Sequence, residues 1–392
     1  MKHTRRTVAA VGAVAVLAMA GCSSSGSGSS SSGAASSGGA TSAGATGGSN
    51  KAYTFAYANV ADSSPLFKLV GDTMVSNGKK VDITVDRFDN NFDPSKALTN
   101  AQLMVQEKPD IAIDWTGTES IGKSIGAVFQ RANTKCIAVN QQISGCPFFN
   151  LVNADLGSGS ADIVAPIMKQ KGWGASNTTM VLLFNPGAGA EVNSNVRYFY
   201  SDIAKQFPGM PQLTPTQITD KTTTIGSLPS AVQLNGQDAL QPSYTAMENE
   251  LQLLPSSRHI VIFTQNDDSA TGAWRAITQA GRQSNTLIIG QGADPAALQQ
   301  LRTNPQWVAE GSVFFELWSE YLLAMGVAIM EGQTPPALTL PPQTVLSKQT
   351  VSKYYGANGT TATVAPPLDP RDDYLIKTGI LQQFGNIEGL KS

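Results

Sequence analysis

Amide, carboxylate and aromatic side chains follow several apolar segments that we predict to be β-strands. Amides donate and accept hydrogen bonds and carboxylates accept them, which suits the hydroxyl groups of a small polar solute. An aromatic ring beside them offers a face for the C–H surface of a sugar. Ligands of open parallel sheets bind beyond the carboxyl ends of the strands. The candidates at such positions are Asn59, Ser63, Ser64, Asp114, Trp115, Asn140, Gln141, Asn185, Asn266, Asp267 and Gln291.

Several candidates also have a purely structural interpretation. Trp115 could instead fill a lobe interface, Asn266 could cap the helix after it, and Phe67 could belong to the core. If Trp115 contacts the solute, Trp115→Ala should weaken binding with little loss of fold. Trp274 and Trp318 lie within helical patterns and are expected to pack.

The residues that common enzyme classes need are missing from the sequence. His259 is the one histidine after His3 and precedes a predicted buried strand, which argues against a Ser-His-Asp triad and a His-rich metal site. Residues 187–189 lack the Gly-Lys-Ser/Thr ending of a phosphate-binding loop. We therefore expect no enzyme, no cofactor and no metal. A carboxylate pair for glycoside hydrolysis, with Asp114 and Glu119 as first candidates, is the least favoured alternative.

The elements that must position the candidates alternate between strands and helices. Strands are predicted at 53–58, 81–85, 110–113, 136–139, 180–184, 217–219, 260–264, 287–289 and 311–315. Helical periodicity covers 66–76, 94–106, 121–132, 196–207, 244–254, 270–280, 295–302 and 319–331. This βαβα order predicts two α/β lobes with doubly wound parallel sheets and right-handed crossovers. From Pro335 onward the signals are weak.

The N-terminal residues predict export and membrane anchoring. Basic residues precede an apolar stretch, Val8–Met19, which has the length of a signal peptide and ends in Met19-Ala20-Gly21-Cys22. This resembles a bacterial lipobox, so we expect a lipoprotein signal peptide at 1–21 and a lipid on Cys22. Residues 22–51 then form a flexible Ser/Gly linker. The alternatives are an ordinary cleaved signal and, from Arg5-Arg6, twin-arginine rather than Sec export.

The charge and the cysteine content of the chain further limit the class of function that is expected. The net charge of −2 without a basic cluster argues against nucleic-acid binding. After Cys22 only Cys136 and Cys146 remain, and an even pair outside the cytoplasm predicts a disulfide, with two free thiols as the alternative.

Four segments resemble type I periplasmic solute-binding proteins, in particular the sugar-binding group similar to ribose-binding protein. Residues 63–67 correspond to a polar-Pro-aromatic turn, and residues 100–113 to a helix and the strand after it. Residues 263–273, Phe-Thr-Gln-Asn-Asp-Asp-Ser-Ala-Thr-Gly-Ala, resemble the family's Asn-Asp-x-x-Ala-x-Gly-Ala segment, and 330–333 its closing helix end. The resemblance covers about 53–345, and the segment around Asn266 is its most specific part.

The resemblance implies two lobes joined by a three-crossover hinge. Lobe 1 would be 52–156 plus 316–333, lobe 2 would be 157–315 plus 334–350, and 351–392 would be a C-terminal tail. By this resemblance, ligand contacts are expected at Ser64, Leu66, Phe67, Asn140, Gln141, Asn195, Asn266, Gly292 and Phe315 or Glu316, and the strand-end rule adds Asp114 and Trp115. Sugar binders often have Asp-Arg where Asn140-Gln141 stand and an aspartate near Gly292. The loss of these charges argues against ribose-type recognition, although Asp294 could compensate. A neutral polyol, another sugar and a non-sugar ligand all stay open as the solute.

The expected function is capture of a small neutral solute, a sugar or polyol, for an ABC-type importer. The protein would be a monomer, lipid-anchored on the extracytoplasmic face of the cell membrane, with the transporter permease as its partner. The alternative is a receptor of the same fold that signals to a membrane kinase.

Overall fold

The computed structural model describes residues 52–226 and 230–390. The predicted signal peptide, Cys22 and the linker therefore lie outside the described residues. In the part of the chain that is described, no helix is both long and apolar enough to cross a membrane.

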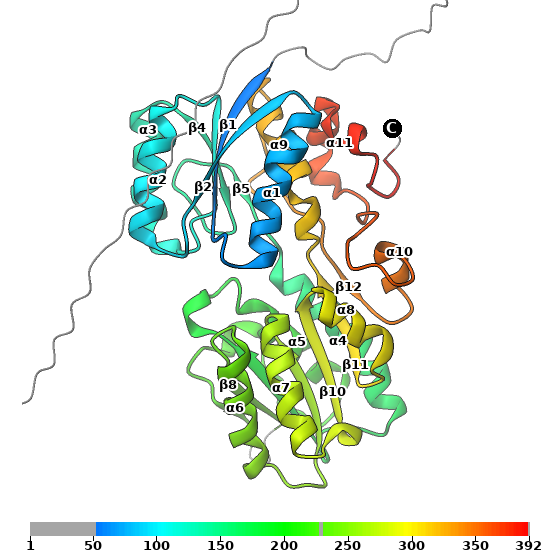
Figure 1. The fold of residues 1–392 in the computed structure, drawn as a ribbon. Helices are drawn as coiled ribbons and strands as arrows, with labels where there is room; N and C mark the ends of the chain where they lie inside the picture. Colours follow the sequence, from blue (N-terminus) through cyan, green and yellow to red (C-terminus); the bar gives the residue numbers. More distant parts are fainter. Residues whose placement is uncertain (1–51, 227–229, 391–392) are drawn as a thin grey trace, which may run out of the picture. The chain divides into compact units, whose positions relative to one another are not determined.

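The first sheet contains five parallel strands in the order β2-β1-β3-β4-β5 (Figure 1). On β1, Phe55 and Tyr57 belong to the core that contains residues of α1 and α9, while Ala56 and Ala58 face the core of α2 and α3. This alternation follows the two-residue period of a strand, and the small alanines let the second helix pair pack closely. The elements are β1 Tyr53–Asn59, α1 Pro65–Lys80, β2 Ile83–Asp89, α2 Pro94–Gln106, β3 Ile111–Asp114, α3 Gly122–Arg131, β4 Lys135–Val139, β5 Phe148–Phe149 and α9 Trp318–Met330.

The second sheet has the order β12-β11-β10-β9-β6-β8-β7, with antiparallel pairing only at its two edges. Helices α4 and α5 pack against each other, and so do α6 and α7. The elements are α4 Asn153–Gln170, β6 Thr178–Phe184, α5 Ser194–Gln206, β7 Thr224–Ile225, β8 Ala231–Asn235, α6 Leu240–Leu253, β9 His259–Thr264, α7 Asp267–Gln279, β10 Thr286–Gly292, α8 Pro295–Thr303, β11 Trp307–Ser312 and β12 Thr344–Leu346. Two doubly wound α/β sheets are thus confirmed.

Two predicted strands differ from the structure, and one helix was not predicted. The strand predicted at 311–315 is β11, which covers Trp307–Ser312. Residues 217–219 are not a strand: a 3₁₀ turn covers Pro215–Gln217, and the strand between β6 and β7 in the sheet is β8. Helix α4 was not predicted, because its Gly, Ser and Pro166 residues weaken the helical pattern. Gly157 explains part of this composition, since a Cβ there would lie 2.1 Å from the Asn195 carbonyl oxygen on α5. The remaining 3₁₀ segments are Glu119–Ile121, Pro186–Ala188, Gln283–Asn285, Phe315–Leu317 and Pro370–Thr378.

The C-terminal residues fold onto the body of the protein. They form α10 Val351–Tyr355, the 3₁₀ segment Pro370–Thr378 and α11 Ile380–Phe384. Tyr355 and Ser312 share a 2.7 Å hydrogen bond between hydroxyl groups, as do Tyr374 and Thr339. Both tyrosines are buried, so this segment contributes to the core.

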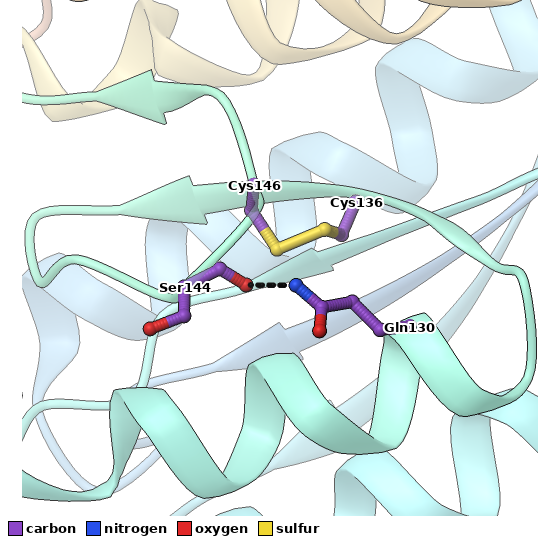
Figure 2. The surroundings of a disulfide bond; sticks show 4 residues. All are labelled: Gln130, Cys136, Ser144 and Cys146. Atoms are coloured by element: carbon purple, nitrogen blue, oxygen red, sulfur yellow. Dashed lines mark hydrogen bonds between the residues drawn. A yellow bond between two sulfur atoms is a disulfide. The ribbon is translucent and has the colours of Figure 1, made fainter.

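Cys136 and Cys146, which the sequence predicts to be bridged, form a disulfide in the structure (Figure 2). Cys136 lies on β4, and Cys146 lies in the loop that leads to β5. The Gln130 side chain on α3 donates to the Ser144 carbonyl in the same loop. The bridge therefore fixes the loop that starts with Asn140 and Gln141.

Candidate ligand-binding site

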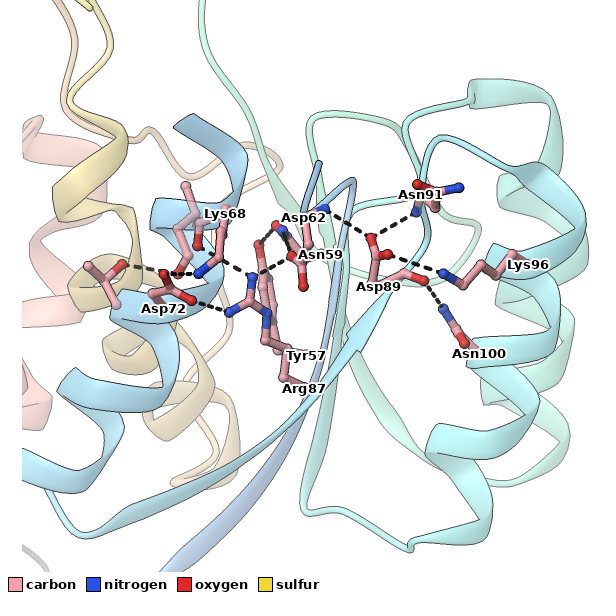
Figure 3. A network of polar contacts seen from close by, with 12 residues as sticks. Tyr57, Asn59, Asp62, Lys68, Asp72, Arg87, Asp89, Asn91, Lys96 and Asn100 are labelled. Atoms are coloured by element: carbon pink, nitrogen blue, oxygen red, sulfur yellow. Dashed lines mark hydrogen bonds and ion pairs between the residues drawn. The ribbon is translucent and has the colours of Figure 1, made fainter. Parts of the chain in front are cut away.

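A polar network occupies the carboxyl end of β1 and β2 (Figure 3). The Tyr57 hydroxyl donates to Asn59 Oδ1 over 2.9 Å, and Asn59 Nδ2 donates to Asp62 Oδ1 over 2.6 Å. The Asp62 amide in turn donates to Asp89 Oδ1 at the end of β2. These contacts hold the backbone that leads into the turn of Ser64 and Phe67.

Arg87 on β2 provides the positive charge of this network. Its guanidinium pairs with Asp62 and with Asp72 on α1, and only 18% of its side chain is exposed. Gly71 makes room for it, because a Cβ at that position would lie 2.3 Å from the guanidinium carbon. Lys96 pairs in the same way with Asp89 over 3.1 Å. The carboxylate of Asp62 is thus paired with Arg87 on β2, and that of Asp89 with Lys96 on α2.

Asp114 ends β3 and is fully buried. Asn90 Nδ2 donates to its Oδ1 over 3.0 Å and also to the Trp115 carbonyl oxygen. Burial raises the pKa of the Asp114 carboxyl from 3.8 to about 7, against the opposing effect of the Asn90 hydrogen bond. Its Oδ2 has no hydrogen-bond partner among the described residues.

Trp115 is the centre of an aromatic cluster. Its ring stacks on Trp318 at 5.2 Å between centroids and on Phe315 at 6.0 Å, and Phe67 meets it edge-on at 4.9 Å. Only 3% of Trp115 is exposed, whereas Phe67 and Phe315 are half-buried. The burial of this ring in the core argues against the expectation that Trp115→Ala would leave the fold nearly intact. Phe67 and Phe315 form the more accessible part of the cluster.

Asn140 and Gln141 follow β4. Asn140 adopts a left-handed conformation with φ 58°, which asparagine tolerates well, and its buried Oδ1 has no partner among the described residues. Gln141 Oε1 accepts from the Gly117 amide over 3.1 Å. Since Gly117 lies two residues after Trp115, the loops after β3 and β4 are joined.

The second sheet carries its own polar end. The Asn185 amide after β6 donates to Gln265 Oε1 over 2.9 Å, and Asn193 Nδ2 donates to the Asn185 carbonyl oxygen. Gln265 Nε2 also donates to Asn193 Oδ1. These contacts link the loops after β6 and β9.

Asn266 has the capping role that the sequence left open. Its Oδ1 accepts from the Ser269 amide in the first turn of α7, and its Nδ2 donates to the Asp238 carbonyl oxygen over 2.8 Å. The Asp238 carboxylate accepts from Asn185 Nδ2, and burial raises the pKa of this carboxyl. Asn266 and Asn185 therefore both hydrogen-bond to Asp238.

The other predicted residues are placed as follows. Ser64 is the N-cap residue of α1 but makes no side-chain cap. Asn195 is buried at the start of α5, where its Oδ1 accepts from the Val196 amide. Glu316 Oε1 accepts from the Ala362 amide over 2.7 Å, which directs its carboxylate to the C-terminal segment.

Sequence reasoning missed four polar residues at the strand ends: Asn90, Asn193, Asp238 and Gln265. Asn90 was missed because β2 was predicted to end at Val85, four residues before its observed end at Asp89. Asp238 was missed because β8, the strand that ends shortly before it, was not predicted. Gln265 stands beside Asn266 in the segment that carried the resemblance, so its position after β9 was the available signal.

Three further features of the described residues concern metal binding, a buried acid pair and a cavity. Among the described residues no group of three or more His, Cys, Asp or Glu side chains could hold a metal ion. Asp267 and Glu310 form a buried acid pair, in which burial raises the pKa of both carboxyls and that of Asp267 to about 7. A cavity of about 350 Å³, lined by residues that include Asp155, Tyr321, Pro341 and Pro366, contains none of the predicted ligand contacts.

Residues 55–333 match the family model described as a periplasmic binding protein domain. The chain belongs to this family. Periplasmic binding proteins are solute-binding proteins rather than enzymes and work outside the cytoplasm, with a small-molecule ligand and a transporter permease as partners. No curated protein matches the sequence.

Solved structures share the fold of this periplasmic binding protein. An ABC transporter solute-binding protein from Mycobacterium smegmatis with bound glycerol is 16% identical at a TM-score of 0.64, covering 80% of this chain and 99% of that one. An ABC transporter solute-binding protein from Bacillus halodurans with bound myo-inositol is 14% identical at a TM-score of 0.63, covering 79% of this chain and 99% of that one. The Caulobacter myo-inositol binding protein is 18% identical at a TM-score of 0.61, covering 78% of this chain and 96% of that one.

Proposed function

We propose that this protein is an extracytoplasmic solute-binding lipoprotein that captures a small neutral sugar or polyol and delivers it to an ABC-type importer. It binds the solute reversibly and does not convert it. The strand ends of its two sheets supply the contacts, with Ser64, Phe67, Asn140 and Gln141 on one sheet and Asn266 on the other.

The neutral, amide-rich character of both sheet ends carries this proposal. Around the first sheet, Asp62 and Asp89 are paired with Arg87 and Lys96, and the pKa of Asp114 is raised to about 7. Most of the amides are held by internal hydrogen bonds, and the Asn140 Oδ1 is an amide oxygen without a hydrogen-bond partner among the described residues. Such groups recognise hydroxyls, and they provide no fixed charge to hold a carboxylate or phosphate.

The aromatic cluster supports a sugar or polyol over a more polar solute. Phe67 and Phe315 are half-buried beside Trp115, so their exposed parts offer an apolar surface next to the amides. Sugars have both hydroxyl edges and C–H faces, and this combination matches them. The structural relatives with bound glycerol and myo-inositol agree with this ligand class.

Attachment and delivery complete the proposal. The lipid on Cys22 and the Ser/Gly linker at 22–51 hold a monomeric body near the permease. Lobe 1 at 52–156 plus 316–333 and lobe 2 at 157–315 plus 334–350 close on the ligand. The closed form is the one that the importer detects.

A thermal-shift and titration series tests this function. The full-length chain in detergent is titrated with glycerol, myo-inositol, D-allose and L-arabinose. We expect one saturable site per chain, a higher melting temperature for at least one compound and a smaller radius of gyration in scattering. Binding of none of them would contradict the proposed ligand class, and an unchanged radius with a tight ligand would contradict closure.

A further inference from the structure

Phe92 is an exposed aromatic residue with an unusual backbone. It lies between β2 and α2, and 52% of it is exposed. Its φ of 53° and that of Asn91, 52°, place two successive residues in the left-handed region. Asparagine and glycine adopt this conformation readily, whereas a bulky side chain does so at a cost in energy.

The backbone contacts explain why this conformation is required but not why the residue is phenylalanine. The Phe92 amide donates to the Val60 carbonyl oxygen over 2.9 Å, and the Asp93 amide donates to the Asn90 carbonyl oxygen. Asp93 then caps α2 by accepting from the amides of Ser95 and Lys96. An asparagine at position 92 would satisfy the same backbone without strain.

The ring of Phe92 extends the aromatic cluster to the surface. It meets Phe67 edge-on at 5.7 Å between centroids, and Phe67 in turn meets Trp115 and Phe315. A Cβ on Gly117, in the loop after β3, would lie 3.3 Å from the Phe92 ring. The ring therefore lies over the loops that follow β1 and β3, beside the predicted ligand turn at Ser64.

We propose that Phe92 is a specificity-determining residue whose ring contacts the C–H surface of the bound solute. This inference rests on the proposed function. Backbone strain persists at a position where the side chain is needed, and a half-exposed ring next to Phe67 adds apolar surface at the outer edge of the cluster. Phe92 thus favours solutes with a continuous C–H face, such as cyclic sugars and cyclitols, over glycerol.

Replacing Phe92 by asparagine distinguishes a ligand contact from a structural role. A ligand contact predicts weaker binding without a loss of stability, whereas a structural role predicts a lower melting temperature. Phe92→Asn removes the ring and relieves the strained backbone. We expect about tenfold weaker binding of the tightest cyclic compound among myo-inositol, D-allose and L-arabinose. We expect the melting temperature to equal or exceed that of the wild type. A value up to about 2 °C lower counts as equal. Phe92→Tyr should bind within about twofold of the wild type, since it keeps the ring.

Leu103→Gln is the matched control, because Leu103 is a 42% exposed apolar residue on the adjacent helix α2. Its affinity should equal that of the wild type. Unchanged affinity of Phe92→Asn, or weaker binding together with a lower melting temperature, would overturn the role of Phe92 while leaving the proposed function intact. Absence of binding by the wild type itself would instead overturn the proposed function, and this inference with it.

Discussion

Asn90 Nδ2 donates to Asp114 Oδ1 over 3.0 Å, while the second oxygen of this buried carboxyl has no hydrogen-bond partner among the described residues. Burial raises the pKa of Asp114 from 3.8 to about 7. The folded chain thus holds a proton that the unfolded chain releases. This contribution to stability is complete below about pH 4 and is lost as the pH rises towards 7.

Asp114→Asn should remove the contribution of this carboxyl to the pH dependence of stability. The variant should match the wild type at pH 5 more closely than at pH 8, where it should be more stable by up to about 4 kcal/mol, since one pKa unit corresponds to about 1.4 kcal/mol. Urea unfolding at the two pH values measures the difference. An equal stability difference at both pH values would contradict a raised pKa at Asp114.

Arg87 should stabilise the ligand turn more than Lys68 does, although both pair with Asp72. The Arg87 side chain is 18% exposed and that of Lys68 is 53% exposed, and solvent weakens the exposed pair. We expect Arg87→Met to lower the free energy of unfolding by about 1–2 kcal/mol and to weaken ligand binding. Lys68→Met, its control, should change stability by less than about 0.5 kcal/mol. Similar effects of the two substitutions in urea unfolding would contradict a special role of Arg87.

Trp115→Ala should destabilise the fold strongly. The ring is buried against Phe67, Phe315 and Trp318, so its removal leaves a cavity in the aromatic cluster. A loss of about 3–5 kcal/mol is expected from denaturant unfolding, together with weaker binding because Phe67 loses its support. Trp274→Ala on α7, where the indole is half-buried, should cost less. A stable Trp115→Ala variant with weak binding would instead favour a direct ligand contact.

The disulfide between Cys136 and Cys146 should stabilise the loop after β4. The two cysteines are 10 residues apart, and the chain-entropy model gives about 3 kcal/mol for a loop of this length. Reduction, or replacement of both cysteines by alanine, should lower the free energy of unfolding by about this amount. Binding should also weaken, because Asn140 and Gln141 begin the bridged loop. No change in either quantity on reduction would show that the loop is held by its other contacts, such as Gln130 to Ser144.

Much of the fold could be predicted from the sequence because strand and helix periodicities are local properties. Helix α2 has the predicted bounds Pro94–Gln106, with Asp93 as its N-cap. Helix α4 could not be found in this way, since Gly157 allows close packing against α5 and Gly159 close packing against Val345 of β12, rather than favouring helix formation. The C-terminal segment gave weak signals for a similar reason: Tyr355 and Tyr374 pack in the core and hydrogen-bond to residues that are distant in the sequence.

The positions of several candidate residues after strands could be predicted, whereas their contacts could not. The rule that ligands bind at the carboxyl ends of parallel strands selected Asn140, Gln141 and Asn266 as candidates, and in the structure they follow β4 and β9. The sequence could not reveal that Asn90 faces Asp114 or that Trp115 is covered by Phe315 and Trp318, because these contacts join segments up to about two hundred residues apart. The left-handed backbone of Phe92 is likewise a property of the folded loop.

Calorimetric titration of the full-length chain tests the central claim most directly. Myo-inositol, D-allose, L-arabinose and glycerol are titrated in turn, and the recovered compound is analysed for chemical change. The account predicts one saturable site per chain for at least one of these neutral compounds and its recovery unaltered. Absence of binding for all four, or conversion of a compound into a product, would contradict it.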